Sequence, residues 1–71
     1  MQVKLAEIRK KAGWSRDRAA VEAGVSYTTC RLYEAARELV ADAAARGRLD
    51  QTYDRIRAIA QNPQAARGRS L

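Results

Sequence analysis

Residues 15–34 read SRDRAAVEAGVSYTTCRLYE, a stretch in which two serines and one glycine mark out two short helices. Ser15 and Ser26 are both placed to cap the first turn of a following helix, because a serine side chain accepts hydrogen bonds from exposed helix amides. Gly24 tolerates the left-handed backbone that commonly ends a helix. We therefore expect one helix from Ser15 to Gly24, a tight turn over residues 23–26, and a second helix that runs through Glu34.

Small and apolar side chains indicate how these two helices pack. Ala20 stands where two closely crossing helices leave room only for a small side chain, and Val25 is expected to close the turn. Cys30 and Tyr33 are three residues apart, so they share one face of the second helix, which we expect to point inward. The opposite face is then exposed. It carries Tyr27, Thr28, Arg31 and Leu32.

The flanking sequence also favours helices. Before this stretch, the helical spacing of Leu5, Ile8 and Ala12 predicts a helix over about residues 2–12 that ends at Gly13. After it, residues 35–45 favour helix as far as Gly47, and the pattern leaves open whether the preceding helix continues or a new one begins.

A last helix is expected over about residues 49–61, and it carries an apolar stripe on one face. The stripe packs either within the monomer or against a second copy of the chain. Its members are Leu49, Tyr53, Ile56 and Ala60. Residues 63–71 have almost nothing apolar to bury, so we expect a disordered basic tail there.

The chain of 71 residues is long enough for one domain. It has one proline and no alternating apolar pattern typical of a strand. We therefore predict an all-α fold, a compact bundle of four to five short helices over residues 1–62.

The composition argues against several classes of site. Cys30 is the only cysteine and there is no histidine, so neither a disulfide nor the usual zinc and iron–sulfur ligand sets are available. There is also no phosphate-binding glycine loop and no nucleophile beside a base. We expect no cofactor, no metal, no small-molecule substrate and no enzymatic activity.

The N-terminal residues lack the apolar run of a signal peptide, and no stretch approaches the length that spans a membrane. Together with the lone cysteine, this pattern predicts a cytoplasmic protein with no membrane partner. Fourteen basic residues against eight acidic ones give a net charge of +6, which makes a polyanion such as nucleic acid a natural partner. Solvated helix faces are the alternative explanation of this charge, since acidic residues are interleaved with the basic ones.

Residues 4–34 resemble the helix-turn-helix of the phage-repressor family, the Xre-like or Cro-like regulators. The resemblance rests on the segment LAEIRKKAGWS of residues 5–15, on Ala20, and on the turn Ala23-Gly24-Val25-Ser26. It implies a lambda-repressor-like fold whose helix-turn-helix spans residues 15–34. Arg16 departs from the pattern, since the family commonly has a glutamine there that supports both a phosphate and the recognition helix. Short regulators of this kind are often found in phages and mobile elements.

The resemblance and the charge together predict a sequence-specific regulator of transcription that binds double-stranded DNA in the major groove. We expect a homodimeric repressor that recognises an inverted repeat. Arg31 is suited to guanine, Thr28 to a base edge or phosphate, and Tyr27 or Leu32 to a thymine methyl group, while Ser26 and Arg16 are suited to phosphates. The full set of expected DNA-binding residues is Arg16, Ser26, Tyr27, Thr28, Thr29, Arg31, Leu32 and Arg37.

Two alternatives remain at this stage. Helix-turn-helix folds also serve as protein-interaction modules, so the chain could be an antitoxin-like or anti-activator adaptor that uses the same surface on another protein. A nonspecific, nucleoid-type DNA binder would share the charge but have no preferred sequence.

Overall fold

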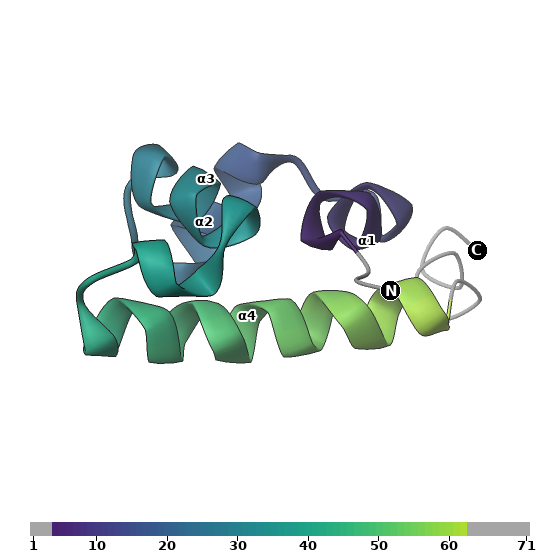
Figure 1. Ribbon diagram of the computed structural model, residues 1–71. Coiled ribbons are helices and arrows are strands. Elements are labelled where there is room, and N and C mark those ends of the chain that lie inside the picture. Colours follow the sequence, from purple (N-terminus) through teal and green to yellow (C-terminus); the bar gives the residue numbers. More distant parts are fainter. Residues whose placement is uncertain (1–3, 63–71) are drawn as a thin grey trace.

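The structure is a computed structural model that describes residues 4–62, and every regular element in this range is helical (Figure 1). The elements are α1 (Leu5–Lys11), α2 (Arg16–Ala23), α3 (Tyr27–Ala35), the short 3-10 helix η1 (Arg37–Leu39) and α4 (Ala43–Gln61). The predicted all-α fold is therefore confirmed. The expected basic tail and the first residues of the expected first helix lie outside the described range.

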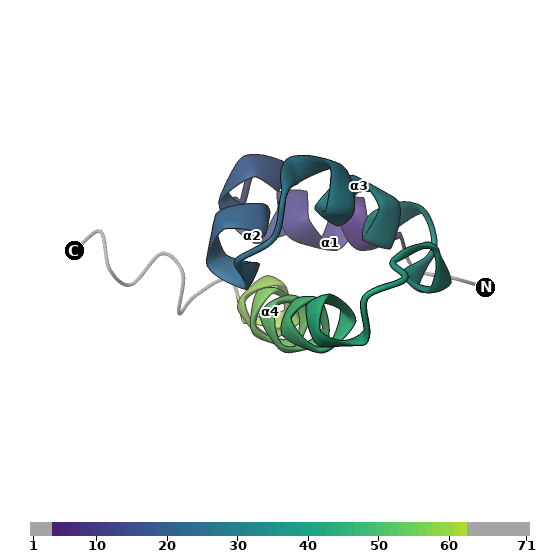
Figure 2. The ribbon, with the colours of Figure 1, turned by 90° about the vertical axis from the view of Figure 1, so that its left-hand side faces the viewer.

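The helices form two layers. α4 is the longest helix and extends along one side of the molecule, while α1, α2 and α3 lie together on its other side (Figures 1 and 2). α1 and α2 both pack on α4, and α2 also packs on α3. None of the helices formed by residues 4–62 combines the length and the apolar character needed to cross a membrane.

Local capping sets both ends of α2 and the start of α3 as the sequence predicts. The Ser15 Oγ accepts a hydrogen bond from the Arg18 amide at 3.1 Å, and the Ser26 Oγ accepts one from the Thr29 amide at 3.1 Å. Gly24 ends α2 with φ of 70°, and Gly13 follows α1 with φ of 82°. Both glycines thus have the left-handed conformation that side-chain-bearing residues rarely adopt.

The core lies between the two layers. Cys30 and Tyr33 are buried, as their spacing predicts, and Ala20 is buried where α2 crosses its neighbours. The apolar stripe of α4 is also buried within the single chain, so the question of whether a second copy covers it is answered in favour of the monomer. The remaining buried apolar residues are Trp14, Ala19, Ala23, Val40 and Ala45.

The expected start of the last helix near residue 49 and the expected helix end at Gly47 are both wrong. α4 does not begin near Leu49 but at Ala43, where the Asp42 carboxylate caps the Ala44 amide at 3.0 Å, and it continues through Gly47 without a break. A glycine inside a helix costs about 1 kcal/mol relative to alanine. Burial of Ala45 and Leu49 on either side of Gly47 outweighs that cost.

The question left open after Glu34 is answered by a break in the chain. α3 ends at Ala35, and Ala36 is extended with φ of −166° and ψ of 128°. The following segment contains η1 and brings Val40 into the core, where it is 3% exposed. α1 is also shorter than expected, because Lys4 is extended and the helix begins at Leu5.

Candidate functional site

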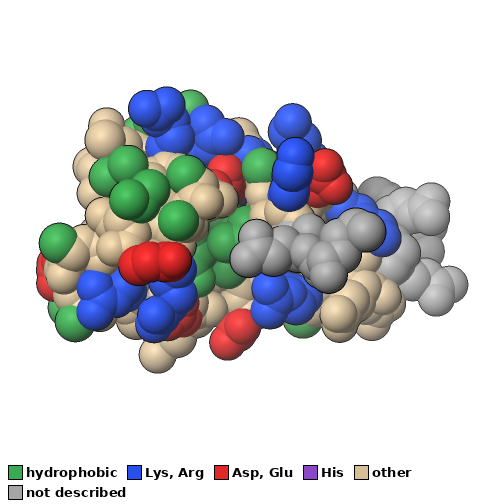
Figure 3. Space-filling model, in the orientation of Figure 1, with side chains coloured by type: hydrophobic (Ala, Val, Ile, Leu, Met, Phe, Trp, Pro, Cys, Tyr) green, Lys and Arg blue, Asp and Glu red, His purple; other side chains and the backbone are tan. Residues whose placement is uncertain are grey.

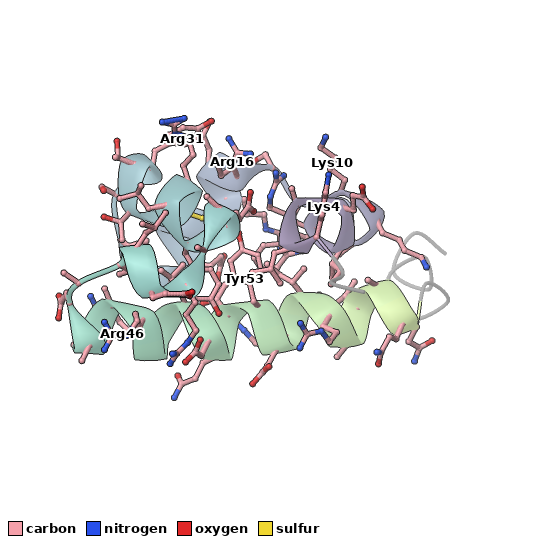
Figure 4. All side chains as sticks on the ribbon, in the orientation of Figure 1. Lys4, Lys10, Arg16, Arg31, Arg46 and Tyr53 are labelled. Atoms are coloured by element: carbon pink, nitrogen blue, oxygen red, sulfur yellow. The ribbon has the colours of Figure 1, made fainter. Side chains whose placement is uncertain are left out.

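One exposed face of the molecule is formed by α1, the start of α2 and α3. The side chains of Lys4, Lys10, Arg16 and Arg31 all lie on this side, away from α4 (Figure 4). The space-filling view shows basic side chains gathered along the same edge (Figure 3). We call these four residues the cationic face.

The outer surface of α3 contributes to this face. Thr28 and Arg31 are exposed, and Tyr27 is 45% exposed, so these three residues point outward as predicted. Leu32 does not, because it is half-buried and packs against the core. The expectation that Leu32 shares the outward face is wrong: with 100° per residue, it turns toward the segment that follows α3 rather than toward Arg31.

Three further expected site residues are engaged in hydrogen bonds within the chain. The Ser26 hydroxyl caps α3 and donates to the Thr29 Oγ1 at 2.9 Å, and Thr29 is half-buried. Arg37 lies after α3, and its guanidinium donates to both oxygens of Asp50 on α4, at 2.9 Å from Nε and 2.7 Å from Nη2. The structure therefore ties Arg37 to α4 and does not bring it together with Tyr27, Thr28 and Arg31.

Arg16 connects the start of α2 to both ends of α3. Its Nε donates to the Glu34 Oε1 at 2.9 Å, and its Nη1 donates to the Tyr27 hydroxyl at 3.0 Å. The guanidinium carbon also lies 5.6 Å from the centre of the Tyr27 ring, within the range of a cation–π contact. The bonds to Tyr27 and Glu34 raise the pKa of Arg16, so the group stays charged while it holds the Tyr27 phenol in one position.

Glu34 is the centre of a buried polar cluster that the sequence interpretation missed. The Arg9 Nε donates to Glu34 Oε2 at 2.6 Å, and both side chains are about 5% exposed or less. Tyr53 of α4 also donates to Glu34 Oε2. Burial alone would raise the pKa of Glu34, but the hydrogen bonds from Arg9, Tyr53 and Arg16 outweigh it and lower the pKa.

One sequence signal could have identified Arg9. It is four residues after Leu5 and three before Ala12, so it falls on the apolar face of α1, where a charged side chain requires a partner. The Arg9 Nη1 also donates to the Trp14 carbonyl oxygen at 2.9 Å. Two arginines, the buried Arg9 and the partly exposed Arg16 of the cationic face, thus share one carboxylate, so the cluster has a net positive charge.

Cys30 lies beside this cluster and is a packing residue. Its sulfur is 3.3 Å from the Tyr53 hydroxyl, and burial raises the pKa of the thiol. A buried thiol with a raised pKa stays protonated near neutral pH, so Cys30 has little nucleophilic character.

The basic residues of α4 either form ion pairs with acids or donate hydrogen bonds to backbone carbonyl oxygens. Arg46 donates to the Val40 and Ala41 carbonyl oxygens, and Arg48 donates to the Ala23 carbonyl oxygen. Ion pairs join two further α4 arginines to acids. They are Arg55 with Glu22 at 3.5 Å and Arg57 with Asp54 at 3.8 Å.

The first layer differs in this respect. Within residues 4–62, the basic residues that make neither an ion pair nor a side-chain hydrogen bond are found on α1, α2 and α3 or beside them. They are Lys4, Lys10, Lys11, Arg18 and Arg31. The Arg18 guanidinium lies 4.0 Å from the centre of the Trp14 ring. The positive charge that remains unneutralised is thus concentrated on α1, α2 and α3.

The described residues contain no group of three or more histidine, cysteine, aspartate or glutamate side chains suited to a metal ion. Comparison of the chain with protein-family models, with curated proteins and with solved structures gave no match.

Proposed function

We propose that this protein binds double-stranded DNA through the cationic face, with α3 in the major groove, and regulates transcription by recognising a specific sequence. One observation carries the proposal: the exposed surface of α3 and basic residues that lack an acid partner lie on the same face of the molecule. An α-helix fits the major groove of B-form DNA, which is about 12 Å wide. Unpaired cations gain affinity for DNA by releasing counterions from phosphates.

The residues divide into two roles. Arg31 is exposed and unpaired in the middle of α3, where it can donate to the O6 and N7 atoms of a guanine. Lys4, just before α1, and Lys10, on α1, lie to the side of α3 and are suited to phosphates, which position the protein without reporting the sequence. Sequence reasoning did not select these two lysines, and the structure adds them to the candidate interface.

Arg16 has an intermediate role in this proposal. Glu34 already accepts hydrogen bonds from Arg9 and Tyr53, so it neutralises Arg16 only in part. Arg16 is therefore available to a phosphate while its Nη1 continues to hold Tyr27. This arrangement supports a preformed interface in which Tyr27 is already oriented before DNA arrives.

The test is duplex binding as a function of salt concentration, combined with selection from a random duplex library. We expect the affinity to fall steeply with salt and a preferred sequence to emerge. Lys4→Gln with Lys10→Gln should reduce the slope of log K against log salt by about 2, since each phosphate contact contributes about 0.9. Arg57→Gln on α4 is the matched control and should leave the slope unchanged.

Arg31→Ala separates the specific from the nonspecific mode. Loss of a bidentate contact to guanine should cost about 1–3 kcal/mol of discrimination at one base pair. A steep salt dependence without any preferred sequence would instead identify a nonspecific DNA binder. Absence of both effects would contradict DNA binding and favour the protein-interaction adaptor.

A further inference from the structure

Tyr53 belongs to α4, but its hydroxyl reaches the polar cluster around Glu34 in the other layer (Figure 4). The residue is 2% exposed. Its hydroxyl donates to Glu34 Oε2 and lies 3.3 Å from the Cys30 sulfur, so the thiol is the donor in that second contact. Burial raises the pKa of Tyr53, and the phenol therefore stays protonated and remains a donor.

From Glu34 the hydrogen bonds continue to the surface. Arg16 Nε donates to Glu34 Oε1 at 2.9 Å, and Arg16 Nη1 donates to the Tyr27 hydroxyl at 3.0 Å. Tyr27 is 45% exposed on the outer side of α3. An unbroken chain of hydrogen bonds thus links a buried residue of α4 to a side chain that the proposed function places against DNA.

The two oxygens of Glu34 are shared unequally. Oε2 accepts from Arg9 Nε at 2.6 Å and also from Tyr53, whereas the second Arg9 donor, Nη2, is 3.5 Å from Oε1. An arginine and a carboxylate pair best through two short parallel hydrogen bonds. Glu34 and Arg9 form only one short bond, which leaves Oε1 to Arg16. The hydrogen bond from Tyr53 opposes rotation of the carboxylate into the symmetric pairing.

We propose that Tyr53 is a positioning residue for DNA recognition: its hydroxyl holds the Glu34 carboxylate in the orientation in which Oε1 faces Arg16. Without that hydroxyl, the carboxylate rotates toward the second donor of Arg9, and the bond to Arg16 weakens. Tyr27 is then no longer fixed before DNA arrives. The link from Tyr53 to Arg16 does not depend on DNA, whereas its effect on recognition rests on the proposed function.

Two tyrosines of the core provide a matched pair of variants. Tyr53→Phe removes the hydroxyl and keeps the ring. Tyr33→Phe is the control, because Tyr33 is 5% exposed and its ring centre lies 5.1 Å from that of Tyr53, but its hydroxyl donates to Asp50 at 2.7 Å. Each variant loses one hydroxyl from the core, so an effect that arises from lower stability alone should appear in both.

The first measurement uses the full chain without DNA. NMR follows the exchange of the Arg16 Nε proton with water at mildly acidic pH, where Glu34 stays ionised because the hydrogen bonds it accepts outweigh burial and lower its pKa. Tyr53→Phe should speed this exchange by about two- to tenfold, the range that corresponds to the net strength of one hydrogen bond. Tyr33→Phe should leave it unchanged.

Helical circular dichroism shows whether each variant is folded. If Tyr53→Phe is partly unfolded, trimethylamine N-oxide, which favours the folded state, is added to every sample so that the comparison is made on folded protein.

The second measurement is selection from a random duplex library. Tyr53→Phe should reduce the discrimination at the base pair nearest Tyr27 by about two- to tenfold, since it acts through the same hydrogen bond. The slope of log K against log salt should change little, because the substitution removes no charge. Tyr33→Phe should keep the discrimination of the wild-type protein.

The two measurements separate this inference from the proposed function. If Tyr53→Phe speeds exchange at Arg16 but the wild-type protein has no affinity for duplex DNA, the link to Arg16 stands and the proposed function fails. If the wild-type protein recognises a DNA sequence but Tyr53→Phe leaves the exchange or the discrimination unchanged, Tyr53 has no positioning role. Equal effects of Tyr33→Phe would overturn the proposal in the same way.

Discussion

Glu34 joins all four α-helices at one carboxylate. It lies on α3 and accepts hydrogen bonds from Arg9 of α1, Arg16 of α2 and Tyr53 of α4. Its side chain is 4% exposed, so a neutral replacement leaves the buried Arg9 guanidinium without its counter-charge. Removal of one partner from a buried pair is far more damaging than the net contribution of the intact pair suggests.

We therefore predict that Glu34→Gln lowers the free energy of unfolding by about 3 kcal/mol, as measured by urea denaturation. The exposed Glu22, which pairs with Arg55 at 3.5 Å, supplies the control. Glu22→Gln should change the stability by less than about 1 kcal/mol. Equal effects of the two substitutions would show that the Glu34 cluster has no special role in stability.

Arg16 is the second residue whose role the structure redefines. From the sequence, Arg16→Ala is expected to weaken binding to all DNA sequences alike. Because the Arg16 Nη1 holds the Tyr27 hydroxyl at 3.0 Å, we now predict a loss of preference as well, at the base pair nearest Tyr27.

Selection from a random duplex library with Arg16→Ala, Tyr27→Phe and the double variant measures this coupling. The double variant should lose no more preference than the larger of the two single losses, since both act through one hydrogen bond. If Arg16→Ala weakens binding to all DNA sequences alike and leaves the preferred sequence unchanged, Arg16 acts only as a phosphate contact.

At the scale of the elements, α4 has an unusual weak point in its second turn. Gly47 is helical and exposed, and a Cβ added there would meet nothing within 4 Å. Alanine at an exposed helix interior position is favoured over glycine by about 1 kcal/mol. Gly47 therefore lowers the stability of α4, although the packing around it does not require a glycine.

Gly47→Ala should accordingly raise the free energy of unfolding by about 1 kcal/mol, or the melting temperature by about 4–8 °C for a chain of this size. Thermal denaturation followed by circular dichroism checks the shift. Gly24→Ala should have the opposite sign, because Gly24 has φ of 70°, which alanine adopts only with strain. A destabilising Gly47→Ala would mean that α4 needs a flexible point at that position.

At the scale of the whole molecule, acid should unfold the protein while mild pH changes should not. The hydrogen bonds from Arg37 and Tyr33 lower the pKa of Asp50 to about 2, and the pKa of Glu34 is also lowered. A carboxyl group whose pKa is depressed by folding stabilises the native state above its ordinary pKa and loses that contribution as pH falls. The sequence contains no histidine, so no imidazole titrates between these values and neutrality.

We predict a urea midpoint that is nearly constant from about pH 5 to 8 and declines between about pH 4 and 2. Asp50→Asn should make that decline shallower, because one of the two depressed carboxyl groups is gone. Urea titrations of both proteins at pH 7 and pH 3 test this expectation. A midpoint that rises on acidification would be inconsistent with these ionised carboxylates stabilising the fold.

The sequence alone determined the helical class, the ends of α2, and the start of α3. Serine caps and left-handed glycines act within one helical turn, so their effect is visible in a short window of sequence. Helical periodicity likewise predicted the buried Cys30 and Tyr33 and the outward Thr28 and Arg31.

Only the tertiary structure decided the features that depend on residues far apart in the chain. Arg9 and Glu34 are 25 residues apart, and their pairing requires α1 and α3 to be packed together first. Packing also carries α4 through Gly47, because burial on both sides of the glycine outweighs its poor local propensity. Whether a surface cation is neutralised depends on acids from other helices, and for this reason Lys4 and Lys10 joined the candidate interface only when the fold was known.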